Sequence, residues 1–241
     1  MIPLADLHIG DAQCNKKLIN DLIDQVKAGD NTYCILGGDL MNTALTTSVS
    51  DTYGETIPPM DQIARCIDLF EPIKDKILAV VGGNHESRTY KTSGINITKL
   101  MCGQLGILDR YSDDTVMLFL YMGKTTKGAK RQVCYSFYIT HGSGGGRKWG
   151  GKINRLVDYA TIVDTDIYIC GHTHSPAIVR QKFYRASHSN ASCSVVDKLF
   201  VNTASSLDYG GYGDVFGYTP GSNKYPVIIL SGTAKQAEAI L

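Results

Sequence analysis

Five of the six histidines lie in four short clusters, two of which also carry aspartate or asparagine, and a fifth cluster carries Asp39 and Asn42. In chain order the clusters are Asp6-Leu7-His8, Gly38-Asp39-Leu40-Met41-Asn42, Gly83-Asn84-His85-Glu86, Thr140-His141-Gly142 and Gly171-His172-Thr173-His174. Carboxylate and imidazole groups together suit borderline divalent metals such as manganese, iron, zinc or cobalt, whereas calcium and magnesium favour oxygen ligands alone. The clusters therefore predict the ligands of two metal ions.

Each histidine taken alone also has a simpler interpretation. A histidine beside glycine often caps a strand or satisfies a buried carbonyl group, and for any single cluster this interpretation is favoured. The sixth histidine, His188, stands in a polar stretch outside every cluster, and we expect it at the surface. The metal site is thus predicted from the five histidines together.

The elements that must position these residues follow from the hydrophobic pattern. Apolar runs predict buried strands over the segments that precede most of the clusters, namely 33–36, 77–81, 132–140 and 167–170. Side chains after the carboxyl ends of such strands meet at one edge of an α/β sheet. If the chain stays extended there, residues two apart share a face, so Asp6 and His8 can bind one ion, as can His172 and His174.

Between these strands the pattern changes to helical spacing. Helices are predicted over 13–28, from Pro59 onwards and over 152–163, which gives a βαβ order. Strands 115–122 and 132–140 read as a hairpin whose tip carries Lys124, Lys127, Lys130 and Arg131. Residues 205–225 are too rich in glycine for regular structure and predict a long surface loop. With 43–60, this loop is a candidate wall for the site.

Composition narrows the class of protein. The 241 residues, 43% of them hydrophobic and 20% charged, favour a globular chain, and we expect one domain over 1–241. No apolar run approaches the roughly 20 residues of a membrane helix, and no secretory signal is evident. Seven scattered cysteines without a CxxC pair are typical of buried thiols in a reducing cytoplasm. The net charge of +1 indicates no partner.

The order of the five clusters resembles the calcineurin-like metallophosphoesterases over residues 6–174. The resemblance implies a four-layer αββα sandwich of two mixed sheets. It implies one metal held by Asp6, His8, Asp39 and His174, and a second held by Asp39, Asn84, His141 and His172. Two such ions can share a hydroxide and neutralise phosphate oxygens. Manganese is the expected metal, with iron, zinc, cobalt and nickel as alternatives.

The resemblance also implies roles for residues outside the metal set. His85 would be the general acid that protonates the leaving oxygen. Many members orient this histidine with an aspartate where this chain has Asn42, whose amide can hold the ring by hydrogen bonding but lacks charge. Arg88 follows the third cluster as in protein serine/threonine phosphatases, which implies that it contacts phosphate, and Asn42 is also counted among the expected substrate-binding residues. The Asp-Arg-Gly of those phosphatases is absent, so a protein phosphatase is not expected.

The glycine-rich stretch after His141 carries Arg147 and Lys148, which can bind phosphate or belong to a solvated connection. Trp149 and the tyrosines of 205–225 can stack on a base or serve packing. We therefore expect a phosphodiesterase acting on nucleic acid or a nucleotide. A phosphomonoesterase with the same metals is the alternative, and a non-catalytic scaffold of the same fold is a third interpretation that the complete ligand set disfavours.

Overall fold

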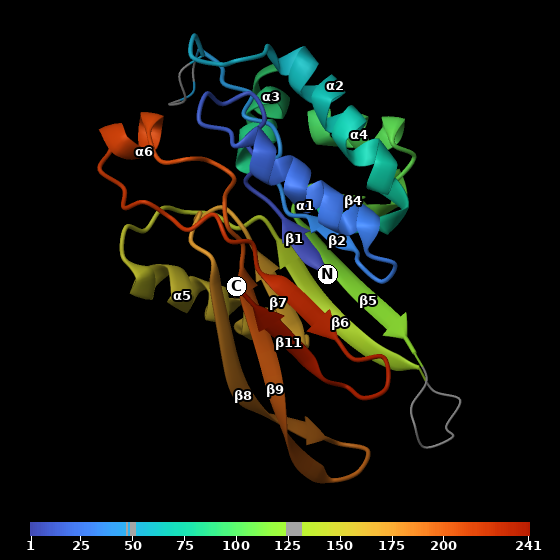
Figure 1. Ribbon diagram of the computed structural model, residues 1–241. Coiled ribbons are helices and arrows are strands. Elements are labelled where there is room, and N and C mark those ends of the chain that lie inside the picture. The colour runs from blue at the N-terminus through green and yellow to red at the C-terminus, as the bar shows by residue number, and fades with distance from the viewer. Residues whose placement is uncertain (47, 49–51, 124–131) are drawn as a thin grey trace.

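The computed structural model describes residues 1–46, 48, 52–123 and 132–241 (Figure 1). The helices are α1 (Lys16–Ala28), α2 (Pro59–Phe70), α3 (Asn84–Ser93), α4 (Ile97–Gln104), α5 (Trp149–Asp158) and α6 (Gly211–Val215). The strands are β1 (Ile2–Leu4), β2 (Cys34–Leu36), β3 (Ile77–Val81), β4 (Tyr111–Ser112), β5 (Thr115–Met122), β6 (Val133–Thr140), β7 (Ile167–Cys170), β8 (Ala177–Ser187), β9 (Ser192–Asn202), β10 (Val227–Leu230) and β11 (Ala237–Ile240).

Two sheets form the centre of the fold. Strands β1-β2-β3-β4 make a four-stranded parallel sheet, and β5-β6-β7-β9-β8 make a five-stranded mixed sheet. The hairpin β10-β11 lies beside β1, where the backbone N–H of Ile228 donates to the carbonyl of Met1 at 2.8 Å. The expectation of two mixed sheets is thus wrong for the four-stranded one, because each connection between its successive strands crosses over through helices, which leaves the strands parallel.

Three hydrophobic clusters define the layers. Ile35 and Val81 of the parallel sheet pack between the two sheets with Phe137 and Ile169 of the mixed sheet. The other face of the parallel sheet packs on α1, α2 and α4. The outer face of the mixed sheet packs on α5 through Leu156. Figure 1 shows α1, α2 and α4 on one side of the sheets and α5 on the other, which confirms the four-layer α/β/β/α order.

The helix positions follow from local sequence. In α1 the side chain of Asn15 accepts from Leu18 N at 2.9 Å, which caps the first turn, and Ile19, Leu22 and Val26 face the core. Helix α2 begins at Pro59, as predicted, because proline lacks the N–H that a first turn leaves unpaired. These two helices cover the strands that carry the site.

The predicted strands are confirmed to within one or two residues, with β5 and β6 antiparallel. The tip carrying Lys124 to Arg131 falls outside the described residues. The prediction that residues 205–225 lack regular structure is wrong, because the short helix α6 lies within them. Helices α3 and α4 were not predicted, since α3 is polar and lacks a strong apolar stripe. No described helix has the length and apolar character to cross a membrane.

Candidate metal centre

All five clusters lie at one edge of the fold, directly after strands. Asp6 and His8 follow β1, Asp39 and Asn42 follow β2, and Asn84 and His85 open α3 after β3. His141 follows β6, while His172 and His174 follow β7. The parallel sheet and the central strands of the mixed sheet therefore bring all eight predicted metal and acid residues together, as the strand-end argument predicted.

The backbone at these residues is left-handed rather than extended. Five of the seven predicted ligands have positive φ: 54° at Asp6, 48° at His8, 50° at Asp39, 68° at His172 and 50° at His174. Each such residue costs roughly 1–2 kcal/mol, because Cβ approaches the following carbonyl oxygen. The reason given for pairing residues two apart, an extended chain, is therefore wrong. Such strain is typical of functional sites.

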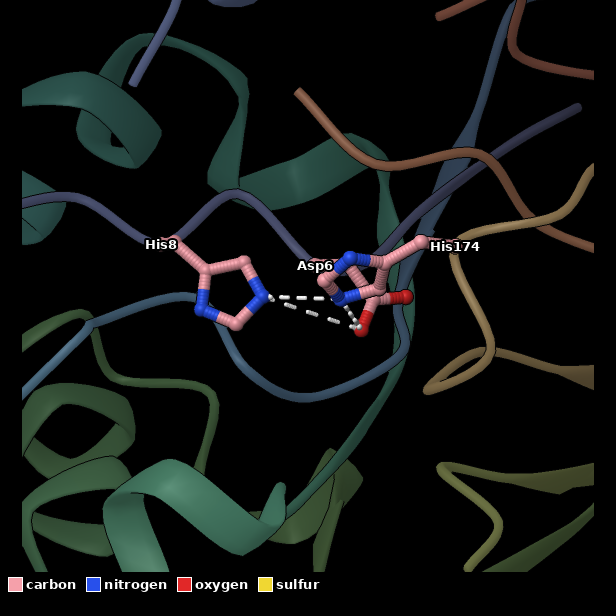
Figure 2. A group of neighbouring side chains, drawn as sticks. All are labelled: Asp6, His8 and His174. Atoms are coloured by element: carbon pink, nitrogen blue, oxygen red, sulfur yellow. Dashed lines mark hydrogen bonds and ion pairs between the residues drawn. The ribbon is translucent and has the colours of Figure 1, made fainter. Parts of the chain in front are cut away.

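The first group of donors consists of Asp6, His8 and His174. Figure 2 shows the two imidazole rings and the carboxylate close together, with Asp6 and His8 on the loop after β1 and His174 on the loop after β7. His8 Nε2 lies 3.0 Å from His174 Nε2, and His174 Nε2 lies 3.3 Å from Asp6 Oδ1. Asp6 is fully buried, and the backbone N–H of His172 donates to its carboxylate at 2.9 Å.

The second group consists of Asp39, His141 and His172, with the amide of Asn84 between the rings. His141 Nε2 lies 3.1 Å from Asp39 Oδ2 and 3.0 Å from Asn84 Oδ1. His172 Nδ1 lies 2.7 Å from the same amide oxygen. His172 thus joins this group and His174 the first, so the expectation that both grip one ion is wrong, whereas the division implied by the family resemblance matches the geometry.

Charge within the second group is strongly coupled. Burial works against charge on both groups, but the neighbouring Asp39 carboxylate raises the pKa of His141 to about 10. The protonated ring in turn holds the pKa of Asp39 well below its usual range. Burial lowers the pKa of His8 and of His172. Without a metal, one proton on His141 is therefore the main compensation for the Asp39 carboxylate.

The donor geometry fits bound cations. Donors about 2.1 Å from a common metal are separated by about 3.0 Å at octahedral angles and about 3.4 Å at tetrahedral angles. Four donor separations, of 3.0–3.3 Å, lie in this range. His172 Nδ1 and Asn84 Oδ1 are closer, at 2.7 Å, and His8 Nε2 and Asp6 Oδ1 are farther apart, at 4.0 Å. The Nδ1 atom of His8 is buried and has no hydrogen-bond partner among the described residues, so no hydrogen bond holds the ring on that side. Together the groups suggest divalent metal binding.

His85 lies beside both groups. Its Nε2 atom is 3.8 Å from Asp39 Oδ2, and its ring centroid is 4.4 Å from that of His8. Its Nδ1 atom is 3.0 Å from two oxygens of Asn42, the backbone carbonyl and Oδ1. Burial lowers the pKa of His85 despite the attraction of Asp39. The ring is near enough to contact a metal or a substrate, and its acid role stays a prediction.

Glu86 is the important residue that the sequence analysis missed. It is 3% exposed, and its carboxylate accepts from the backbone N–H groups of Gly83, Asp39, Leu40 and Met41 at 2.5–3.1 Å. Burial, reinforced by Asp39, raises the pKa of Glu86 to about 7. Glutamate three residues after the helix cap is a capping-box signal that was available in the sequence.

Glycine at position 83 permits this close arrangement. A Cβ atom at Gly83 would lie 2.0 Å from Asp39 N and 2.3 Å from Asp39 Oδ1. Any side chain there would push the Asp39 carboxylate away from its present position. Gly83 therefore couples the start of α3 to the position of Asp39.

A cleft of about 450 Å³ opens over both donor groups. One wall comes from residues 205–225, as predicted, including Tyr209 and Tyr218. No described residue of 43–60 lines this cleft, so that expected wall is wrong; this segment lies behind Asn42 instead. The glycine-rich stretch 144–146 and Arg147 form another part of the lining.

The predicted substrate-binding residues divide between the cleft and the surface. Arg88, Asn42 and Arg147 line the cleft, and the Arg147 guanidinium lies 5.5 Å over the Tyr218 ring. Lys148 is exposed at the start of α5 and does not line it. Lys152, which lies one helical turn further along, lines the cleft instead. Its Nζ donates to the Thr173 carbonyl at 3.1 Å, whereas α5 turns Lys148 outward.

The pattern of a known family matches residues 4–176, and that family is described as calcineurin-like phosphoesterase. The chain belongs to this family. The match spans every residue of the two donor groups, and membership supports phosphoester hydrolysis in general. No curated protein sequence matches the chain.

Solved structures resemble this calcineurin-like phosphoesterase at low identity. A single mutant of Vps29 from Entamoeba histolytica is 12% identical, with 99% of this chain and 97% of that chain covered and a TM-score of 0.47. The nuclease MPE of Pseudomonas putida is 14% identical, with coverage of 99% and 86% and a TM-score of 0.41. A predicted phosphoesterase from Streptococcus pneumoniae is 17% identical, with coverage of 88% and 75% and a TM-score of 0.34. We draw no functional conclusion from these likenesses.

Proposed function

We propose that the chain is a dinuclear metal-dependent phosphodiesterase that acts on nucleic acid or nucleotide substrates. The observation that carries the proposal is the placement of Asp39 at the base of the cleft. Its carboxylate belongs to the second donor group and also lies near His8 and His85. A carboxylate in this position can bridge two cations. Family membership supports the hydrolase class.

The proposed ligands divide as the geometry groups them. Asp6, His8 and His174 would hold one ion, Asn84, His141 and His172 the other, and Asp39 would contact both. Two divalent ions, manganese being our first choice, would lower the pKa of a water and neutralise charge on the phosphate. The left-handed backbone at five of these residues keeps the donors in place before any ion arrives.

The other residues would bind and orient the substrate. We assign Arg88 and Arg147 to the phosphate oxygens, because both guanidinium groups line the cleft. His85 would deliver a proton from Nε2 to the leaving oxygen. Burial lowers its pKa, and an anionic phosphate arriving nearby would raise it again and favour the protonated ring.

The choice of a nucleotide or nucleic acid rests on the cleft wall. Tyr209 and Tyr218 line the cleft together with Arg147, which already lies over the Tyr218 ring. Aromatic faces and cations together are the common way of binding single strands and nucleotides. A phosphate on the metals would therefore leave its base close to these rings.

A substrate panel tests the proposal. Protein loaded with manganese is assayed on an aryl phosphate diester, an aryl phosphate monoester, cyclic nucleotides and single-stranded DNA, with Asp39→Asn as the inactive control. We expect diesters to be hydrolysed with kcat/KM at least about 10-fold above the monoester, because the open cleft accepts a second ester arm. Preference for the monoester would instead support a phosphomonoesterase with the same metals.

We also propose that residues 1–241 form one domain, since β10 pairs with the first residue of the chain. The cytoplasmic location stays a prediction from the cysteine content. That prediction assumed buried thiols. Cys34, Cys66, Cys102 and Cys170 are buried, whereas Cys193 is exposed on β9.

A further inference from the structure

The environment of His85 fixes where its ring carries a proton. Nδ1 lies 3.0 Å from the backbone oxygen of Asn42 and 3.0 Å from its side-chain Oδ1. A carbonyl oxygen only accepts hydrogen bonds, so Nδ1 must be the donor. The neutral ring then keeps its lone pair on Nε2, the atom that faces Asp39 Oδ2 at 3.8 Å. The backbone oxygen requires this donor by itself, and the Asn42 amide adds a second acceptor only while its Oδ1 points at the ring.

Glu55 determines the orientation of that amide. Asn42 is 2% exposed, and its Nδ2 donates to Glu55 Oε1 at 3.2 Å. In the reversed orientation the NH₂ group would meet the Nδ1–H of His85, and the amide oxygen would meet the Glu55 carboxylate. Both contacts would be repulsive, so the carboxylate selects the orientation that is observed.

Glu55 is itself held by groups that cannot reverse. Ala44 N donates to its Oε1 at 2.7 Å, and Gln62 Nε2 donates to its Oε2 at 2.9 Å. Gln62 is fully buried, with Oε1 accepting from Thr43 N at 2.9 Å and Nε2 donating to the Ile57 carbonyl at 3.0 Å. The hydrogen-bond direction is therefore set by the main chain and passed through Gln62, Glu55 and Asn42 to His85.

Only a carboxylate satisfies this position. Three donors, from Asn42, Ala44 and Gln62, point at the two oxygens of Glu55. A glutamine would offer one oxygen and would turn an NH₂ group toward at least one of these donors. Glu55, which accepts from the uncharged Asn42 amide, therefore has the side chain that these three donors require.

We propose that Glu55 is a positioning residue for His85, acting through Asn42 to hold the ring with its proton on Nδ1 and its Nε2 toward the reacting phosphate. The proposal rests on the proposed function only in giving His85 a substrate. Glu55 does not line the cleft over the two donor groups, so we place it in contact with neither the substrate nor the ions. Its effect is predicted to reach the reaction through the ring alone.

A double-mutant cycle distinguishes this positioning role of Glu55 from a purely structural role in which it only stabilises its loop. An aspartate at position 42 presents an oxygen to His85 in either rotation, so it no longer needs Glu55. We expect Glu55→Ala to lower kcat about 10-fold or more with KM changed less than about 2-fold. The same change in an Asn42→Asp background should cost less than about 2-fold. Equal losses in both backgrounds, or no loss in either, would overturn the proposal.

A spectroscopic measurement answers the question without turnover. In metal-free, nitrogen-15-labelled protein the Nδ1–H signal of His85, identified by its absence in His85→Gln, should be sharp in wild type and broadened by water exchange in Glu55→Ala. An unchanged signal would contradict the proposal, even if the protein hydrolysed no phosphoester. Should Glu55→Ala fail to fold, Glu55→Gln is measured in the same way, and the same outcomes apply.

Discussion

The Nε2 atoms of His8 and His174 lie 3.0 Å apart, although 166 residues separate them in the chain. Two neutral imidazole nitrogens at this distance repel unless a proton or a cation lies between their lone pairs. Asp6 Oδ1 is 3.3 Å from His174 Nε2, so an anion stands beside the pair. This arrangement favours a cation at the first donor group.

The first prediction concerns that group alone. His174→Ala removes one donor of three, and we expect the protein to lose about one of two bound ions while the second group keeps its own. Elemental analysis after dialysis measures the content. His188→Ala is the matched control, since His188 is exposed in the turn between β8 and β9. Loss of both ions, or of none, would contradict the division into two groups.

A second prediction follows from His141. In the metal-free protein its raised pKa, about 10 against an ordinary 6.5, means that the folded state holds a proton that the unfolded state has released. The stabilisation is fully present below pH 6.5 and is lost as the pH rises through about 10. Urea unfolding of metal-free protein at several pH values should show this decline, and His141→Gln should lack it. Parallel curves for the two proteins would refute the assignment.

A third prediction concerns Glu86. Glu86→Gln turns an NH₂ group toward backbone donors that now meet a carboxylate, and each buried donor left unpaired costs about 1–3 kcal/mol. We expect the free energy of unfolding, measured in urea without metal, to fall by at least about 1 kcal/mol. Glu238→Gln on the exposed strand β11 is the control and should change it by less than about 0.5 kcal/mol. An unchanged free energy of unfolding in Glu86→Gln would show that the four hydrogen bonds to the Glu86 carboxylate contribute little to stability.

The sequence predicted most of the residues at the site and the strand ends that bring them together, but not the backbone conformation that directs their side chains. Asp6 and His8 were paired on the assumption of an extended chain, whereas both have left-handed backbone. Strand alternation is readable from side-chain pattern, but positive φ at a non-glycine residue is imposed by tertiary contacts, here the backbone bonds from the loop after β1 to the loop after β2. Such contacts leave no local signal.

Helix α3 is one element that the sequence analysis did not predict, because it lacks apolar periodicity. Helix α3 is polar and depends on Glu86 and Gly94 at its ends rather than on a buried stripe. The link from Glu55 to His85 joins residues 30 positions apart through side chains whose types are ordinary in a loop. Only the folded arrangement makes a network of them.

The fourth prediction separates His85 from the metal ligands. His85→Gln should lower kcat by about 100-fold or more while metal content stays unchanged, because the acid contributes about 10²–10⁴-fold to such reactions. The loss should shrink for substrates whose leaving group is a weak base and needs no proton. If the variant loses metal instead, His85 is a ligand and our role for it is wrong.

The most direct measurement is the metal content of wild-type protein beside Asp39→Ala, both reconstituted with manganese and dialysed before elemental analysis. We predict about two ions per wild-type chain and a clear loss from both groups in Asp39→Ala, since a bridging carboxylate serves both ions. Wild-type protein that retains no ion under any loading condition, or an Asp39→Ala variant that retains both, would contradict a two-metal phosphoesterase.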